Sequence, residues 1–169
     1  MTLTTHAVAG AAVAGTLGTY PFIALPVAFL SHFLLDAIPH LDYGLKSAKK
    51  FAGDSPGVEL SFGKDFLIDI LRVGTDLVLG LILAWLVFYL LGDNKIGGLI
   101  LAGALLGVLP DFMQFAYGKL KTKSLAYFQS WHNYFHSSIR LDNRPVLGIL
   151  SQILIICFIL IWINFFKNF

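Results

Sequence analysis

The chain has 169 residues, of which 57% are hydrophobic and only 13% are charged. Because a soluble domain carries roughly 25% charged residues, this composition excludes an ordinary soluble protein and indicates a polytopic membrane protein, with residues 1–169 forming a single membrane-embedded domain. The formal net charge is only +2 and the lysines are dispersed along the chain, so we expect no binding to nucleic acid.

The first half of the chain predicts three apolar helices. Residues 3–19 are rich in alanine and glycine, which let membrane helices approach closely, so a packed inner helix is expected here. Residues 22–38 form a second span, which ends at Pro39 because a proline disfavours helical backbone in the residue before it. A polar connection with a short interfacial helix is expected over residues 43–63. Residues 64–91 then predict a long third helix, polar in its first three turns.

The second half of the chain adds two more spans. A run rich in glycine, alanine and leucine covers residues 96–109 and is expected to end at Pro110. Residues 117–145 form a second polar connection, and residues 145–166 form the last span. The sequence therefore predicts an all-α fold, a polytopic helical membrane bundle with about five transmembrane helices.

The distribution of positive charge predicts the orientation of this bundle. Nine of the 12 Lys and Arg residues fall in the segments 39–64 and 117–145, whereas two fall on the opposite side. Positive residues accumulate on the cytoplasmic side of membrane proteins. We therefore expect both segments and the N-terminus to lie inside, and the C-terminus to lie outside.

Histidine and aspartate recur at a four-residue interval in two segments. His32, Asp36 and His40 follow this interval, and so do His132 and His136. Positions i and i+4 on a helix share a face, so neighbouring members of each series can present their side chains to one ion. Such groups are costly in or near hydrocarbon unless they have partners, and together they suit a divalent metal. The alternatives are a private hydrogen-bonded pair in the bundle and, for the second segment, an interfacial helix whose histidines face water.

The predicted topology brings the candidate metal ligands to one membrane depth. They lie at the inner ends of the spans or in the connections on that side: His6, His32, Asp36, His40, Asp111, His132 and His136. This set exceeds the four ligands of one zinc, so we expect one or two divalent ions, with zinc as the metal. Asp76, about three turns into the third helix, is harder to explain without a function and is predicted to be a ligand or the catalytic general base. Asp42 is expected to be a turn residue or a hydrogen-bonding partner of a ligand.

Three short motifs resemble those of a known family. They are Thr5-His6, Leu109-Pro110-Asp111 and His132-Asn133-Tyr134-Phe135-His136-Ser137. In this order they resemble the bacterial inner-membrane family of membrane-bound metal-dependent hydrolases and, more distantly, the all-helical zinc-dependent phospholipase C group. The resemblance implies hydrolysis at a metal centre held by histidine and aspartate, in the bacterial inner (cytoplasmic) membrane.

Together these features predict a zinc-dependent hydrolase that acts on a lipid or lipid-linked phosphoester at the cytoplasmic side of the membrane. The metal would lower the pKa of a bound water to about 7 and polarise a phosphoryl or acyl oxygen. Three lysines after the second span are expected to hold the anionic head group: Lys46, Lys49 and Lys50. The alternative is an ion or proton transporter, or a structural membrane protein, in which the same groups form a polar relay or network. The apolar outer halves of the spans disfavour the transporter.

Overall fold

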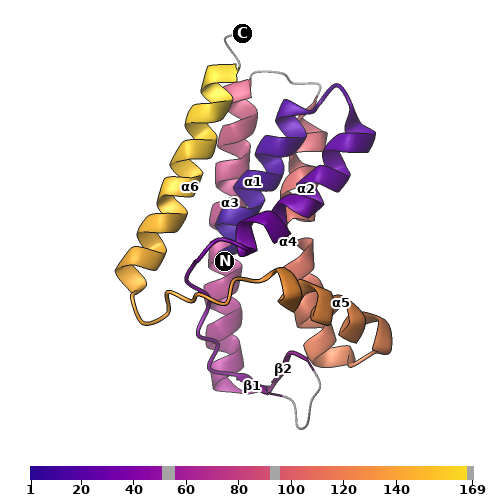
Figure 1. The fold of residues 1–169 in the computed structure, drawn as a ribbon, viewed down its shortest axis with the longest axis vertical. Coiled ribbons are helices and arrows are strands. Elements are labelled where there is room, and N and C mark those ends of the chain that lie inside the picture. Colours follow the sequence, from indigo (N-terminus) through magenta and orange to yellow (C-terminus); the bar gives the residue numbers. More distant parts are fainter. Residues whose placement is uncertain (51–55, 92–95, 167–169) are drawn as a thin grey trace.

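The computed structural model describes residues 1–50, 56–91 and 96–166. Within these ranges the chain is mostly helical, as the sequence predicts, with one small two-stranded sheet (Figure 1). The elements in chain order are α1 (Leu3–Thr16), α2 (Pro21–Asp36), β1 (Ala48–Lys50), β2 (Val58–Leu60), α3 (Lys64–Leu91), α4 (Gly97–Leu120), α5 (Lys123–Phe135) and α6 (Pro145–Phe166).

Three helices of the described residues, α3, α4 and α6, are long and apolar enough to cross a membrane. They and α2 expose large apolar side chains, including Phe22, Trp85 and Ile161, on a surface that suits lipid better than water. With 16 residues α2 is shorter than the roughly 20 residues that a crossing needs, and α1 has only 14. The membrane character is therefore supported, while the count of five spans stays a prediction.

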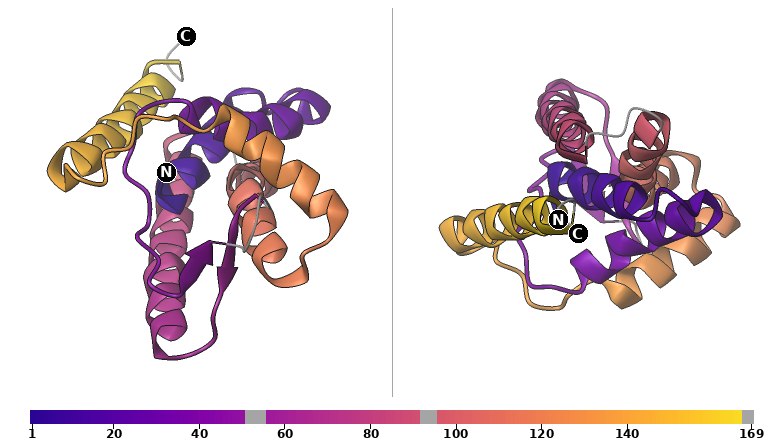
Figure 2. Two further views of the ribbon diagram at one scale, coloured as in Figure 1. Left: turned by 60° about the horizontal axis from the view of Figure 1, so that its bottom comes forward. Right: turned by 90° about the horizontal axis from the view of Figure 1, so that it is seen from above.

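Helix α1 forms the centre of the bundle. It packs against α2, α3, α4 and α6, and the view from above places it among these helices (Figure 2). Its approach to α4 brings backbone against backbone: a Cβ added to Gly10 would lie 2.2 Å from the carbonyl oxygen of Gly103, and one added to Gly107 would lie 2.4 Å from that of His6. The packed inner helix predicted from the small residues is confirmed.

The prediction that the fourth span ends at Pro110 is wrong. Helix α4 runs through this proline and ends only at Leu120, where Lys121 takes a left-handed conformation with φ of 51°. Proline removes one helical N–H and crowds the preceding turn, but a helix buried among neighbours tolerates this cost. Pro110 is itself fully buried. The consequence is that Asp111 lies inside a continuous helix.

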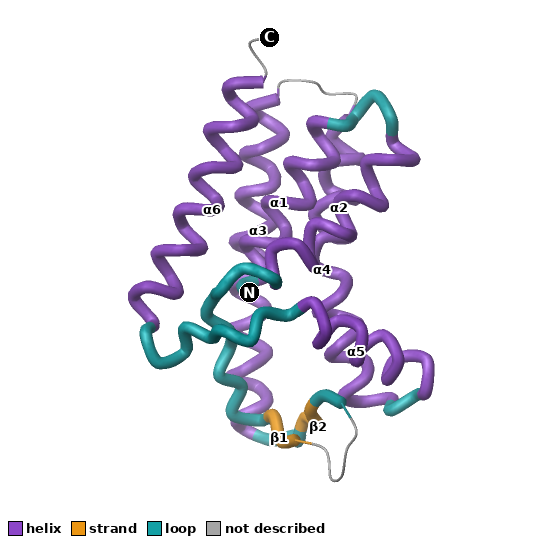
Figure 3. Tube along the Cα trace, in the orientation of Figure 1, coloured by secondary structure: helices purple, strands orange, loops and turns teal. Residues whose placement is uncertain are grey.

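The interfacial helix predicted within residues 43–63 is also wrong for the part that the structure describes. Strands β1 and β2 pair there as an antiparallel hairpin, with Ala48 opposite Leu60. Gly57, just before β2, has φ of +94°, a conformation that favours glycine and does not continue a helix. The strands lie at the end of the molecule opposite the C-terminus (Figure 3). The short amphipathic helix of this protein is instead α5, within the second polar connection.

Candidate metal centre

Four helices contribute the sequence-predicted ligands to one cluster. Helix α1 supplies His6 from its first turns, α2 supplies His32 and Asp36 from its last turn and a half, α4 supplies Asp111, and α5 supplies His132. The loops that follow α2 and α5 add the last two histidines, His40 and His136. The cluster lies near the N-terminus label in Figure 1, at the end of α2 and midway along α4. All seven residues predicted as ligands are thus brought together.

Backbone pairing holds the two histidine segments side by side. Ser137 donates its N–H to the carbonyl oxygen of Asp36 at 2.7 Å, and Leu141 donates to that of His40 at 2.9 Å. His40 and Arg140 also form an isolated parallel bridge. The chain after α5 therefore runs alongside the chain after α2, although about 100 residues separate the two segments.

Asp36 is the centre of the cluster. Its carboxylate is 1% exposed and lies within 3.3 Å of three imidazoles: 3.2 Å from Nε2 of His6, 3.1 Å from Nε2 of His32 and 3.3 Å from Nε2 of His132. His32 and Asp36 are four residues apart on α2, as the shared helical face requires. A carboxylate this deeply buried is stabilised only when positive or hydrogen-bonding partners surround it.

The backbone fixes which nitrogen of two histidines faces the cluster. Nδ1 of His32 lies 2.8 Å from the carbonyl oxygen of Gly107, and Nδ1 of His40 lies 2.7 Å from that of Ile38. Because a carbonyl oxygen only accepts, each Nδ1 carries a hydrogen, and in the neutral imidazole Nε2 then presents its lone pair inward. Backbone carbonyls orient metal-binding histidines in the same manner.

The first group of donors has the dimensions of a single metal site. His32, Asp36, Asp111 and His132 each offer one atom, and these atoms lie within 4.8 Å of one another. Nε2 of His32 is 3.0 Å from Nε2 of His132, and the two nitrogens are 3.1 and 3.3 Å from Oδ2 of Asp36 and 3.7 and 3.9 Å from Oδ1 of Asp111. Ligands about 2.1 Å from a tetrahedral zinc lie roughly 3.4 Å apart, in the middle of this range.

A second group shares Asp36 with the first. It contains Asp36, His40 and His136, again within 4.8 Å of one another. Asp42 joins it, because Nε2 of His40 lies 3.0 Å from Oδ1 of Asp42 and Nε2 of His136 lies 3.4 Å from Oδ2. The amino group of Met1 lies between the two carboxylates, 3.1 Å from Oδ1 of Asp36 and 2.8 Å from Oδ1 of Asp42.

Asp42 and His136, which lie outside the helices, have shifted pKa values. Burial acts to raise the pKa of Asp42, but hydrogen bonds from His136 and His40 outweigh it and hold this pKa well below its ordinary range. The hydrogen bond to Asp42 in turn raises the pKa of His136 against the opposing effect of burial. Sequence reasoning gave Asp42 only a supporting role. Its position two residues after His40 is the signal that places it beside the ligands.

Several atoms of the cluster are buried without a hydrogen-bond partner among the described residues. They are Nδ1 and Nε2 of His6, Oδ2 of Asp36 and Nδ1 of His132. Nε2 of His6 is close to Asp36 but is not oriented for a hydrogen bond, and the His6 ring stacks on His32 with 3.8 Å between the centroids. A buried polar group without a partner costs about 1–3 kcal/mol. A divalent cation would be bound by both Oδ2 of Asp36 and the inward-facing imidazole nitrogens, so these residues fit a metal.

Asp76, predicted to be a ligand or the general base, is hydrogen-bonded to the first turn of α1 and to Tyr43, and its chemical role stays a prediction. Its carboxylate accepts from the backbone N–H of Thr4 at 3.0 Å, from the Thr4 hydroxyl at 2.7 Å and from the hydroxyl of Tyr43. Burial and the bond to Asp76 raise the pKa of Tyr43, which keeps it a donor. The first turn of a helix has N–H groups without intrahelical partners and favours negative charge. The geometry therefore gives Asp76 the role of capping α1 from the neighbouring helix α3.

Other segments cap the first turn of α1 in the same way. The N–H of Thr2 donates to the side chain of Gln152 on α6 at 2.9 Å, and the N–H of Leu3 donates to the hydroxyl of Tyr43 at 2.9 Å. Gln152, Tyr43 and Asp76 together provide hydrogen-bond acceptors for the N–H groups at the start of the helix that carries His6. The position of the first ligand thus depends on three distant segments.

The positive charge beside Asp42, at the rim of the cluster, comes from Arg140 and not from the lysines predicted to hold the head group. Lys49 lies on β1 and Lys46 just before it, at the hairpin end of the molecule (Figure 3). Arg140, by contrast, is 58% exposed and places Nη2 2.7 Å from Oδ2 of Asp42.

No protein-family model, curated protein or solved structure matches the chain.

Proposed function

We propose that this protein is a membrane-embedded, metal-dependent hydrolase that acts on a lipid or lipid-linked phosphoester at the cytoplasmic side of the bacterial inner membrane. The observation that carries the proposal is the set of distances among His32, Asp36, Asp111 and His132, which match those among the ligands of one tetrahedral ion. One or two zinc ions would be held, the first by these four residues with His6 beside them, and the second by Asp36, His40 and His136 with Asp42 beside them.

The bound metal would supply the Lewis acidity that activates water and polarises a phosphoryl oxygen. The chain's own residues supply the rest of the site. Asp36 links the two groups of ligands and keeps the imidazoles in place from the buried side. Arg140 lies at the exposed rim, and a guanidinium binds phosphate oxygens through two parallel hydrogen bonds. Asp111, at 23% exposed, is the least buried member of the first group.

Helix α5 supports a substrate that is presented at the membrane surface. Tyr127, Trp131 and Tyr134 follow the spacing i, i+4, i+7 and are exposed, with Tyr134 at 81%. His132 lies on a different face of the same helix and is buried in the cluster. Exposed tyrosine and tryptophan favour the head-group layer of a bilayer. If α5 lies in that layer, the cluster is at the depth of a lipid phosphate.

The proposal also keeps the predicted topology of five spans, with the N-terminus inside and the C-terminus outside. In this arrangement α1 and α2 cross as short helices within a bundle whose longer members are α3, α4 and α6. The cluster, at the start of α1 and the end of α2, then lies at the cytoplasmic boundary.

The test is elemental analysis of the detergent-purified protein together with hydrolysis assays. We expect about one to two zinc ions per chain, lost in large part in His32→Ala and His132→Ala but retained in Ser130→Ala, a change on the exposed side of the same helix α5. Zinc removal should abolish hydrolysis of a phosphodiester, and zinc addition should restore it. A folded protein that holds no metal and does not respond to added zinc would refute the proposal.

A further inference from the structure

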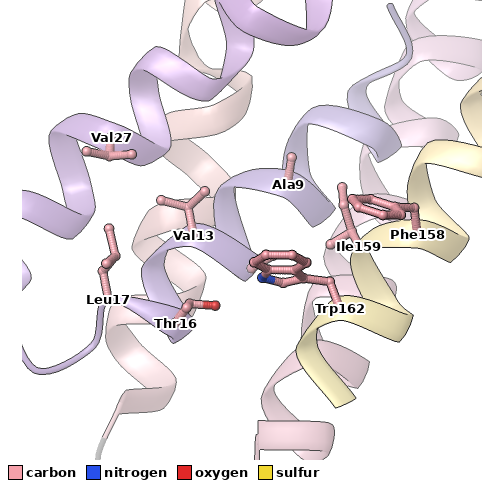
Figure 4. A pocket seen from close by; sticks show the side chains of 9 residues that line it. Ala9, Val13, Thr16, Leu17, Val27, Phe158, Ile159 and Trp162 are labelled. Atoms are coloured by element: carbon pink, nitrogen blue, oxygen red, sulfur yellow. The ribbon is translucent and has the colours of Figure 1, made fainter. Parts of the chain in front are cut away.

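A second feature of the bundle is an apolar cavity of about 320 Å³ between α1, α2 and α6. The close-up shows Ala9 and Val13 of α1, and Leu17 just after it, between Val27 of α2 on one side and Phe158 and Trp162 of α6 on the other (Figure 4). These residues bear no charge, and the three helices are apolar along this stretch. The chemistry of the cavity suits hydrocarbon and offers little to a polar ligand.

The cavity continues the helical face that carries His6. His6, Ala9 and Val13 follow the spacing i, i+3, i+7, which keeps side chains on one side of α1, and Leu17 comes directly after this helix. With a rise of 1.5 Å per residue, the cavity begins roughly 4.5 Å beyond His6 along the axis of α1 and extends for about 12 Å to Leu17. One wall of the cavity therefore lies on the same face of α1 as a proposed metal ligand.

Helix α6, which forms the opposite wall of the cavity, also has polar contacts with α1 at the cluster end of the molecule. Helix α6 runs in the same direction as α1 (Figure 1), and Gln152 joins the two at the level of the cluster through Thr2 and Thr5. Phe158 and Trp162 lie further along α6, next to the cavity. The polar junction of the two helices is thus on the cluster side, and the apolar cavity is on the side away from it.

We infer that this cavity holds the hydrocarbon chain of the substrate, whose phosphoester then lies at the metal centre. The inference rests on the proposed function and narrows its substrate class to amphiphiles that carry a long aliphatic chain. The position favours this occupant because a chain extended along α1 places its polar end beside His6, whereas an unrelated bilayer lipid has no reason to be bound in that register.

Fluorescence quenching of Trp162 tests the inference without any activity assay. In a Trp85→Phe/Trp131→Phe background, Trp162 is the remaining tryptophan of the chain. The probe is a lysophospholipid brominated at mid-chain, added to the zinc-loaded protein in detergent. We expect saturable quenching. The same brominated chain carried as a fatty alcohol should need at least a tenfold higher concentration, because it lacks the phosphate. Equal potency of the two probes would overturn the inference, since the chain site would then be independent of the metal centre.

Filling the cavity gives a matched pair of variants. Val27→Phe places a ring in the cavity, whereas Val78→Phe adds the same ring to the exposed surface of α3. Quenching should weaken at least tenfold in the first and stay unchanged in the second. Equal quenching in both would mean that ordinary bilayer or detergent lipid is being detected, and it would overturn the inference. Leu17→Phe, from the other wall, repeats the measurement if Val27→Phe does not fold.

Two controls separate this inference from the proposed function. Metal content and hydrolysis of bis(p-nitrophenyl) phosphate, which has no long chain, should be the same in Val27→Phe and the parent. Loss of either property in the parent itself would count against the hydrolase, while the quenching comparison would still decide whether the cavity binds a chain.

Discussion

The Nε2 atoms of His32 and His132 lie 3.0 Å apart, although 100 positions separate the two residues in the chain. In the neutral imidazole of His32 the hydrogen is on Nδ1, where it meets the carbonyl oxygen of Gly107, so Nε2 then accepts. His132 can answer it by donating from Nε2, but its own Nδ1 is then buried without a partner. A cation bound by both Nε2 atoms would let each act as an electron-pair donor, so neither nitrogen would have to donate to the other.

Because Asp36 belongs to both groups of ligands, its substitution should weaken zinc binding at both sites, whereas loss of a ligand from one group should weaken binding at one site. Asp36→Asn keeps the size of the side chain but removes the charge that serves both groups of ligands, whereas His136→Ala removes a ligand of the second group alone. Zinc affinity measured by equilibrium dialysis should fall at both sites in the first variant and at one in the second, each by at least about tenfold. Asp65→Asn, an exposed carboxylate on α3, is the control and should bind as the parent does. Identical losses in the two cluster variants would show that the groups are not separate.

The close approach of α1 and α4 predicts a sharp effect of one methyl group. In Gly107→Ala the new Cβ would lie 2.4 Å from the carbonyl oxygen of His6, so the helices must separate, at a cost of about 1–3 kcal/mol. Gly74→Ala on α3 meets nothing within 4 Å and should instead stabilise the protein by roughly 0.5–1 kcal/mol. Thermal unfolding in detergent compares the two. An unchanged midpoint in Gly107→Ala would contradict the described packing.

The hydrogen bonds of Asp76 predict a loss of stability with retention of metal. Asp76→Asn removes the charge at the start of α1 and one of its acceptors, which costs about 1–3 kcal/mol. Tyr43→Phe should act in the same direction, because it removes a partner of both Asp76 and Leu3. Unfolding curves and elemental analysis on the same samples check this. A catalytic Asp76 would give the opposite pattern, with normal stability and a roughly hundredfold loss of hydrolysis.

The asymmetry of Lys and Arg predicts the membrane topology. A reporter fused after Phe169 should be periplasmic, and one inserted within residues 43–60 should be cytoplasmic. Reporter activity and accessibility to a membrane-impermeant label provide two independent readouts. The same location for both reporters would require an even number of crossings between them and would remove the common depth assigned to the ligands.

The sequence predicts the apolar helices and the proximity of His32 to Asp36 well because both depend on local patterns. Spacing of four residues is sufficient to place His32 and Asp36 on one helical face, and small residues are sufficient to identify α1 as an inner helix. The continuation of α4 past Pro110 is not predictable in this way, since the tolerance of a buried proline comes from neighbouring helices.

The role of Asp76 shows the same limit. An acidic residue deep in an apolar helix suggests chemistry when the sequence is read alone, but its partners Thr4 and Tyr43 come from other parts of the chain. Arg140 is given no role in the site from the sequence alone, because only the pairing of its segment with His40 brings it to Asp42. Side chains whose partners are distant are assigned correctly only when the fold is known.

The dependence of the start of α1 on Gln152, Tyr43 and Asp76 has a consequence for biosynthesis. Because Gln152 lies on α6, the N–H of Thr2 obtains this partner only after α6 has been translated and has docked against α1. A nascent chain without α6 would therefore leave one N–H at the start of α1, four residues before His6, without this partner. On the proposed function, a chain truncated before Pro145, which still contains all five histidines, should therefore bind zinc more weakly than the full chain does.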